Sequence, residues 1–233
     1  MNEETVGSMP EDVNAGSRPY RSPRRAAQAA ATRHAVLAAA RELLGEAGYA
    51  GTTVAAIARR ADVAVDTVYA SVGRKPEVLR QLVETALSGT DETVPAAQRD
   101  YVRRIREATT AGGKIAIYAG AIAGIQQRLA PVFLALRDAA ARDATTASLW
   151  REISERRARN MREFAADLRA TGELRDDLTD DEVADVLWSM NAAEYWVLLV
   201  EERGWTPARF AAWIEDAWTR LLLARLDLPG CSA

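Results

Sequence analysis

"TTVAAIARRADVAVDTVYASVGRKPEVL", residues 52–79, is the stretch of this 233-residue chain that decides its fold. Val54 and Ile57 give a first short helix an apolar side, and Val68 anchors a second short helix after a tight connection. Helices of this length are not stable alone in water, so both must pack against the longer helix predicted over 22–47. Two short helices supported by a third in this way are typical of a helix-turn-helix unit.

Residues that start and stop helices occur at consistent places around this unit. Ser22 and Pro23 suit a cap and a first helical turn, and Gly48 ends the first helix. Thr53 can cap the exposed amide groups of the next helix, and such amides are also a ready site for a phosphate. Lys75 stands at another helix start and adds a mobile cation there.

The charge of the chain is unevenly distributed. The net charge of -3 divides into -4 for residues 1–17, +5 for residues 18–85 and -4 for residues 86–233. A basic segment in an acidic protein favours a local contact with a polyanion, because fixed cations gain free energy when counterions leave the phosphates. A surplus this modest also fits an ordinary solvated face, so both interpretations stay open.

Composition predicts a globular protein with little scope for metal or redox chemistry. Hydrophobic residues make up 48% of the chain, which is ample for a packed core. The longest apolar stretch, residues 115–125, is too short to span a bilayer, so we expect a soluble, cytoplasmic protein with no membrane contact. With one cysteine, Cys231, and one histidine, His34, we expect neither a disulfide framework nor a metal site, and no cofactor.

Helical spacing of apolar residues continues through the rest of the chain, and no strand is convincing. We therefore predict an all-α fold. After a polar break at 89–95, the predicted helices occupy about 96–110, 114–128, 131–143, 147–170, 180–202 and 207–227. The expected organisation is a disordered tail with a basic end over 1–21, a three-helix helix-turn-helix domain with its connecting helix over 22–88, and a larger helical regulatory and dimerisation domain over 89–229.

The run from Arg33 to Leu79, "RHAVLAAARELLGEAGYAGTTVAAIARRADVAVDTVYASVGRKPEVL", resembles the amino-terminal DNA-binding domain of the tetracycline-repressor (TetR) family of bacterial transcription regulators. The matching features keep their spacing without gaps: Ala39-Ala40, Leu43-Leu44, Gly48-Tyr49, Thr53 with Ile57-Ala58, Val63, Thr67 with Val68-Tyr69, and Lys75 with Val78-Leu79. The resemblance implies a ligand-responsive DNA-binding regulator that is not an enzyme, with repression as the commoner mode of the family.

The resemblance also implies a recognition helix over 64–70. The residues that it implies at the DNA are Thr67 and Tyr69 in direct contact, Val65 and Asp66 near base edges, and Thr53 and Lys75 on phosphates. Because this helix carries no arginine or lysine, bidentate reading of guanine is excluded and phosphate contacts must supply much of the affinity. The candidate donors are Arg33, Arg59, Arg60, Lys75 and the arm arginines Arg18, Arg21, Arg24 and Arg25, which could enter a narrow minor groove.

This segment departs from the family pattern at three places. Ser71-Val72 stands where an aromatic pair is usual, Ala64 where a serine cap is frequent, and Asp66 where a glycine is common. These differences bear on which bases the helix contacts, so the individual assignments are expectations.

Large aromatic residues with a few polar neighbours predict a ligand pocket in the second two-thirds of the chain. The candidate lining residues are Tyr118, Ile122, Trp150, Met161, Trp188, Asn191, Glu194 and Tyr195. Glu194 lies in an apolar stripe of the helix predicted over 180–202, so its carboxylate needs a partner. It could bind a cationic or hydroxylated ligand, or pair with an arginine, and we favour the pairing.

The last two predicted helices carry more apolar surface than one core face can use. Their large apolar residues are Trp188, Trp196, Phe210, Trp213, Trp218, Leu221 and Leu222. A homodimer formed through these helices would bury the surplus, as the resemblance also implies. We expect that dimer to bind a palindromic double-stranded operator and to be released by a small-molecule effector.

Two other functions are compatible with parts of the sequence. A sequence-indifferent architectural DNA-binding protein would explain the basic segment but not the large acidic remainder. A helical-bundle enzyme finds little support, because the stretch "AGGKI" at 111–115 lacks the earlier glycine and the following hydroxyl of a phosphate-binding loop.

Overall fold

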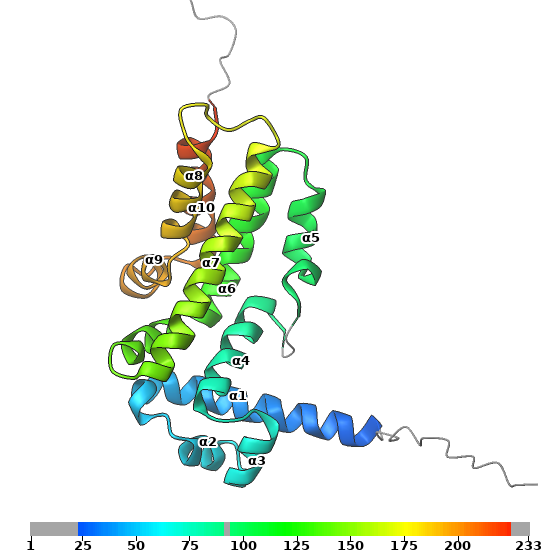
Figure 1. The fold of residues 1–233 in the computed structure, drawn as a ribbon, viewed down its shortest axis with the longest axis vertical. Helices are drawn as coiled ribbons and strands as arrows, with labels where there is room; N and C mark the ends of the chain where they lie inside the picture. The colour runs from blue at the N-terminus through cyan, green and yellow to red at the C-terminus, as the bar shows by residue number, and fades with distance from the viewer. Residues whose placement is uncertain (1–22, 91–93, 225–233) are drawn as a thin grey trace, which may run out of the picture.

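The computed structural model describes residues 23–90 and 94–224, and the regular structure in those residues is helical (Figure 1). The elements are α1 (Pro23–Gly51), α2 (Val54–Arg60), α3 (Val65–Ser71), α4 (Lys75–Ser88), η1 (Ala96–Gln98), α5 (Asp100–Glu107), α6 (Ala111–Ala140), α7 (Ala144–Arg169), α8 (Asp180–Met190), α9 (Ala193–Trp196), η2 (Val197–Glu202) and α10 (Pro207–Leu222). The all-α prediction is confirmed. The predicted tail over 1–21 and the end of the last domain, 225–229, lie outside the described residues.

The predicted helix-turn-helix unit is formed by α1 to α4. In Figure 1, α1 runs across the long axis of the molecule, and α2 and α3 lie below it in this view. The side chains of Ile57 from α2, Val68 from α3 and Leu79 from α4 are all at most 1% exposed, and they share one core with Val36 of α1. The two short helices are therefore stabilised by burial against α1, since their length alone would not sustain them.

A kink at Gly48 separates the long part of α1 from its last turn. Gly48 has φ 62° and ψ -172°, a conformation that only glycine adopts without strain. The hydroxyl of Thr52 donates a hydrogen bond to the Gly48 carbonyl at 2.8 Å, and the Thr52 N–H reaches the same oxygen at 3.2 Å. The kink turns the chain so that Thr53 can begin α2.

Gly48→Ala is expected to lower the free energy of unfolding by about 1 to 3 kcal/mol, because a Cβ strains this backbone conformation. No atom lies within 4 Å of the added Cβ, so the loss comes from the backbone and not from a clash. Gly45→Ala is the matched control: it also meets open space, but in ordinary helix, and should stabilise the chain by about 0.5 to 1 kcal/mol. Urea titration followed by circular dichroism measures both, and equal effects would contradict the assignment of strain to Gly48.

The long helix α6 is the centre of the molecule. It packs against α1, α4, α5, α7 and α10, and it replaces the two helices predicted over 114–128 and 131–143. The predicted break at Pro131 is wrong. Proline within a helix costs about 3 kcal/mol, but the residues on either side, Ala130 and Val132, are both 0% exposed, and this packing outweighs the loss of one backbone hydrogen bond.

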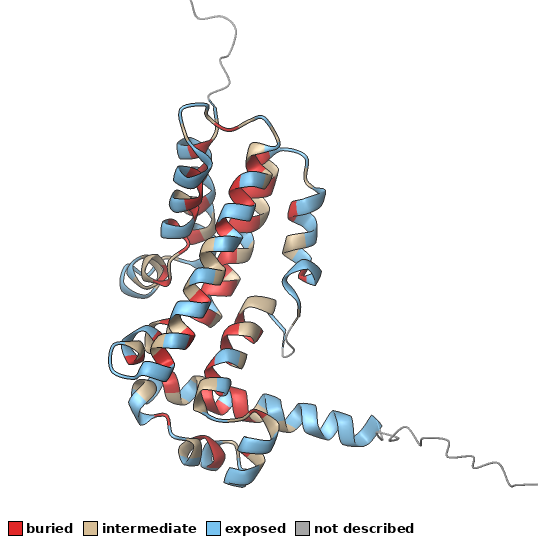
Figure 2. Ribbon diagram, viewed as in Figure 1, coloured by how far each residue is buried: buried red, intermediate tan, exposed pale blue. Residues whose placement is uncertain are grey.

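Helix α6 is also long and apolar enough, by length and composition alone, to cross a membrane. In this fold 56% of its most apolar 18-residue window is buried inside the protein. Figure 2 shows the buried positions of α6 and α7 turned toward one another and toward their neighbours. These properties are those of the core helix of a helical bundle.

The helix predicted over 180–202 is interrupted. Helix α8 ends at Met190, a short α9 follows, and the chain continues as the π-helical turn η2. The physical reason lies in Asn191, whose carbonyl accepts a hydrogen bond of 2.9 Å from the buried side chain of Gln126. The Gln126 side chain thus occupies the Asn191 carbonyl, which in a continuous helix would accept a backbone N–H.

The apolar surplus of the last two helices is smaller than the sequence predicts. Trp196, Phe210, Trp218 and Leu222 are at most 3% exposed and belong to the core of the chain itself. The large apolar side chains that stay exposed in this region are Trp188 (39%), Leu198 (50%) and Leu221 (44%). Trp188 and Leu221 come from α8 and α10, which pack side by side (Figure 1).

Candidate DNA-binding face and effector cavity

Helix α3 exposes an apolar, an acidic and an aromatic side chain to solvent. Tyr69 is 48% exposed and Val65 is 40% exposed, and Asp66 is exposed between them. Thr67 is half-buried, while Val68 is fully buried and fixes the helix to α1 and α2. A helix held by one side and free on the other can enter a groove about 12 Å wide.

The candidate phosphate donors fall into two groups. Thr53 caps α2, its hydroxyl oxygen accepting a hydrogen bond of 3.1 Å from the Ala56 N–H, and Arg33 is exposed on α1. Arg60 is instead engaged within the domain, at 2.9 Å from Glu42 and 2.8 Å from Glu46. Of the other predicted donors, Arg24, Arg25 and Arg59 are exposed, and Arg18 and Arg21 lie outside the described residues.

Lys75 is held against the end of α1. Its ammonium donates a hydrogen bond to the Tyr49 carbonyl and lies 3.5 Å from the centre of the Tyr49 ring. Partial burial lowers the pKa of Lys75, and the charge of Asp143 acts in the opposite direction. Tyr49 also accepts a hydrogen bond of 3.0 Å from the Thr146 hydroxyl of α7. Lys75 therefore contributes to the junction between the helix-turn-helix unit and the rest of the chain.

Lys75→Ala distinguishes a phosphate contact from a purely structural role. If Lys75 moves from Tyr49 to a phosphate when DNA binds, the alanine variant should lose affinity equally for specific and random duplexes. The slope of its log affinity against log salt concentration should also decrease by about one unit per protomer. Arg80→Ala is the control. Arg80 lies on α4 as Lys75 does, but its side chain pairs with Glu152 of α7. An unchanged salt slope together with a lower melting temperature would show that Lys75 serves only the junction.

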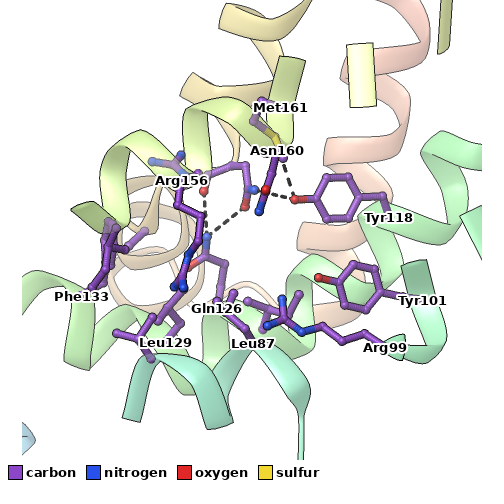
Figure 3. A pocket seen from close by; sticks show the side chains of 16 residues that line it. Leu87, Arg99, Tyr101, Tyr118, Gln126, Leu129, Phe133, Arg156, Asn160 and Met161 are labelled. Atoms are coloured by element: carbon purple, nitrogen blue, oxygen red, sulfur yellow. Dashed lines mark hydrogen bonds between the residues drawn. The ribbon is translucent and has the colours of Figure 1, made fainter. Parts of the chain in front are cut away.

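A cavity lies between α4, α6 and α7 and opens beside α5 (Figure 3). Its enclosed part measures about 70 Å³, and it adjoins a wider recess of about 300 Å³. The two spaces share Arg99, Tyr101, Tyr118, Asn160 and Met161. The apolar part of the wall is made by residues such as Leu87, Ile125, Leu129 and Phe133.

A chain of polar groups crosses the cavity wall. The hydroxyl of Tyr118 accepts a hydrogen bond of 3.1 Å from the Asn191 side chain, and its own proton faces only the Met161 sulfur at 3.9 Å. Burial raises the pKa of Tyr118, so the phenol stays protonated. The side-chain amide of Gln126 donates to Asn191, but its buried Oε1 has no hydrogen-bond partner among the described atoms. The wall therefore holds an unused acceptor and a weakly satisfied donor.

The structure brings together three of the eight predicted pocket residues, Tyr118, Met161 and Asn191. Ile122 is fully buried in the core, and Trp150 packs against Phe133 at 4.5 Å between ring centres. Trp188 lies on the surface beneath the Arg157 guanidinium, and Tyr195 packs against Trp213. Glu194 forms an ion pair with Arg137, the alternative that we favoured from the sequence.

The sequence prediction omits the charged part of the cavity, which is Arg99, Arg156 and Arg157. Arg156 and Arg157 occur in the run "SERRARN" of α7, which has the composition of a solvated helix face. Arg99 directly precedes α5 and is 8% exposed. No local pattern identifies these residues, because only the packing of α7 against the start of α5 brings Arg99 to Arg156 and Arg157.

Residues 36–82 match the sequence model of the bacterial regulatory proteins of the tetR family. This segment of the chain is a tetR-family segment. The match covers α2, α3 and most of α1 and α4, which are the elements that present the exposed side of α3. It agrees with the resemblance found in the sequence over the same stretch.

Solved structures similar to this chain share its fold over most of their length. A SmeT complex with triclosan has a TM-score of 0.64 and 20% identity, covering 84% of this chain and 93% of that one. The fatty acid degradation regulator FadR from Bacillus halodurans has a TM-score of 0.64 and 17% identity, with coverage of 80% and 94%. A transcriptional regulator from Saccharomonospora viridis in complex with choline has a TM-score of 0.61 and 16% identity, with coverage of 83% and 98%. No curated protein matches the sequence.

Proposed function

We propose that this chain is a ligand-responsive transcription regulator that represses its target genes by binding a palindromic operator as a homodimer. The observation that carries the proposal is the free face of α3, with Tyr69, Val65 and Asp66 exposed above a buried Val68. In this proposal Thr67 and Tyr69 contact the DNA, while Thr53, Arg33 and Lys75 hold the phosphate backbone. The protein acts in the cytoplasm, where its operator is located.

The symmetry of a dimer makes the proposed operator a palindrome. Two copies of α3 placed about 34 to 36 Å apart would meet successive major grooves on one side of B-DNA. The exposed Trp188 and Leu221 on α8 and α10 support a dimer formed through these helices. The chain offers apolar surface there that its own core leaves uncovered.

The cavity between α4, α6 and α7 is the proposed effector site. Similar proteins have been solved in complex with triclosan and with choline, which supports small-molecule binding by proteins of this fold. The effector would favour a dimer whose two α3 helices are wrongly spaced. A coupling free energy of about 1 to 3 kcal/mol between the two sites would weaken operator binding roughly 5- to 150-fold.

Footprinting of the purified protein on the DNA upstream of its own gene tests the proposal directly. We expect a protected palindrome and, in a competition gel shift, discrimination of this sequence from random duplex by about 10³-fold or more. Equal binding to both duplexes would instead support the sequence-indifferent architectural protein. Absence of binding to any duplex would contradict both DNA-binding functions.

A further inference from the structure

The effector cavity holds more positive charge than its surroundings balance. Arg99, Arg156 and Arg157 line its enclosed part, whereas no aspartate or glutamate does. Glu84 of α4 lies outside it, in a separate recess that Arg99 and Arg156 also line. The wider recess beside α5 does contain Glu163 and Asp167, and Asp167 is paired with Lys114. Within the described residues, Glu84 is the carboxylate that forms ion pairs with the arginines of the enclosed part.

The two oxygens of the Glu84 carboxylate contact two different arginines. Glu84 Oε1 lies 2.6 Å from an Nη1 of Arg156, and Glu84 Oε2 lies 3.5 Å from an Nη2 of Arg99. The Arg99 side chain is only 7% exposed, and its Nε donates to the Val94 carbonyl at 3.2 Å. A buried guanidinium with so long an ion-pair distance keeps much of its cost of leaving water.

Within the described residues, no carboxylate lies in hydrogen-bond contact with Arg157. It donates to the Trp188 carbonyl and stacks over the Trp188 ring at 4.7 Å. Burial lowers the pKa of Arg157, and the charge of Glu194 opposes this effect only partly. Arginine keeps its proton in proteins, so Arg157 adds a charge that the cavity wall does not neutralise.

We propose that the effector of this chain is a small amphipathic organic anion, whose carboxylate replaces Glu84 as the partner of Arg99 and Arg156. This inference rests on the proposed function, because it names the ligand class of the same effector site. Planar guanidinium groups bind carboxylates through two parallel hydrogen bonds, which gives both strength and orientation. Tyr118 can offer its phenol proton to the same anion in place of the Met161 sulfur.

The rest of the wall sets the size of the anion. Tyr101 stacks on Tyr118 with ring centres 5.9 Å apart, and Phe164 meets Tyr118 edge-on at 5.0 Å. A benzene molecule fills an apolar cavity of about 150 Å³, whereas the recess beside α5 measures about 300 Å³. The recess suits one aromatic ring or a short alkyl chain, and the adjoining enclosed part holds the unpaired Gln126 Oε1 as an acceptor for a hydroxyl group of the ligand.

Glu84 connects this exchange to the DNA-binding domain. It lies on α4, and the side chain of Gln81 on the same helix donates to the carbonyl of Val72 at the end of α3, at 3.1 Å. An anion that takes Arg99 and Arg156 from Glu84 removes the contacts that hold α4 to α5 and α7 at this level. Helix α4 is then free to shift, and α3 shifts with it.

Isothermal titration of the full-length protein with phenylacetate and with its uncharged analogue phenylacetamide tests the charge requirement. We expect phenylacetate or the alkyl probe hexanoate to bind, and phenylacetamide to bind about 10- to 100-fold more weakly, because hydrogen bonds between charged partners are lost. Equal binding of the acid and the amide, or no binding of either carboxylate at millimolar concentration, would overturn the proposal.

Two substitutions test the residues with opposite signs. Arg99→Gln should weaken phenylacetate binding about 10- to 100-fold, and Arg156→Gln, which alters a half-exposed side chain, serves if Arg99→Gln fails to fold. Glu84→Gln should strengthen binding about 10-fold, because it removes the internal competitor of the ligand. Glu155→Gln, an exposed carboxylate on α7, is the charge control and should leave the affinity unchanged.

A merely structural role of Glu84 gives the opposite result, since Glu84→Gln would then weaken binding together with stability. That outcome overturns the proposed exchange. A gel shift without any ligand separates this inference from the proposed function. If the protein binds its operator but binds neither phenylacetate nor hexanoate, only the proposed ligand class is refuted. If the protein binds no DNA, the proposed function is refuted.

Discussion

Leu221→Glu is expected to turn the proposed dimer into a monomer and to weaken operator binding by about 10²- to 10⁴-fold. Linking two DNA-binding units makes the second contact effectively intramolecular, and affinity falls by this factor when the link is broken. Leu221 is 44% exposed on α10, and Trp188 is 39% exposed on α8, which packs against α10. A charge placed in an apolar interface cannot be desolvated without a partner, so it opposes association.

Sedimentation velocity and a gel shift on the footprinted operator measure the two effects on the same sample. Thr219→Glu is the matched control, because Thr219 is exposed on the same helix and the substitution adds the same charge. We expect Thr219→Glu to leave the dimer intact if its side of α10 faces solvent. A Leu221→Glu protein that remains dimeric would place the interface elsewhere on the molecule.

Tyr69→Ala is expected to weaken operator binding about 30- to 150-fold, from a loss of about 1 to 1.5 kcal/mol in each of two half-sites. Tyr69 is 48% exposed, so its removal leaves little of the core uncovered. The free energy of unfolding should therefore change by less than about 0.5 kcal/mol, as for most surface substitutions. A gel shift and a urea titration distinguish loss of contact from loss of fold.

Tyr69→Phe separates the hydroxyl of this residue from its ring. If the hydroxyl bonds a phosphate, the phenylalanine variant should lose most of the affinity that the alanine variant loses, on specific and random duplexes alike. If the ring packs against a thymine methyl group, the phenylalanine variant should bind nearly as well as the original protein. Unchanged binding by both variants would mean that α3 does not use Tyr69 at the DNA.

The elements predicted from local pattern agree closely with the structure. Thr53 is the cap of α2, and Gly48 is the site of the kink near the end of α1. These features depend on one or a few neighbouring residues, so the sequence is sufficient to locate them. The same holds for the buried anchor Val68, because a seven-residue helix has few alternatives for its core side.

Predictions failed where a distant partner changed the local preference. Pro131 does not end a helix, because α6 is packed between other helices along its length. The helix ends at Asn191, because the Asn191 carbonyl accepts a hydrogen bond from the side chain of Gln126, 65 residues earlier. Arg60 stays a candidate phosphate donor, but the sequence did not predict that Glu42 and Glu46 of α1 would lie within hydrogen-bond distance of it.

By itself the sequence determined the helical class, the helix-turn-helix unit and the family resemblance of residues 36–82, because these follow from spacing along a short stretch of chain. Only the tertiary structure decided which residues form the proposed effector cavity. Arg99, Arg156 and Glu84 come from three separate elements, and their charges matter to one another only after packing has removed the water between them. Ligand chemistry in this protein is therefore a property of the assembled helices, whereas the DNA-binding face is already visible in the order of residues along α3.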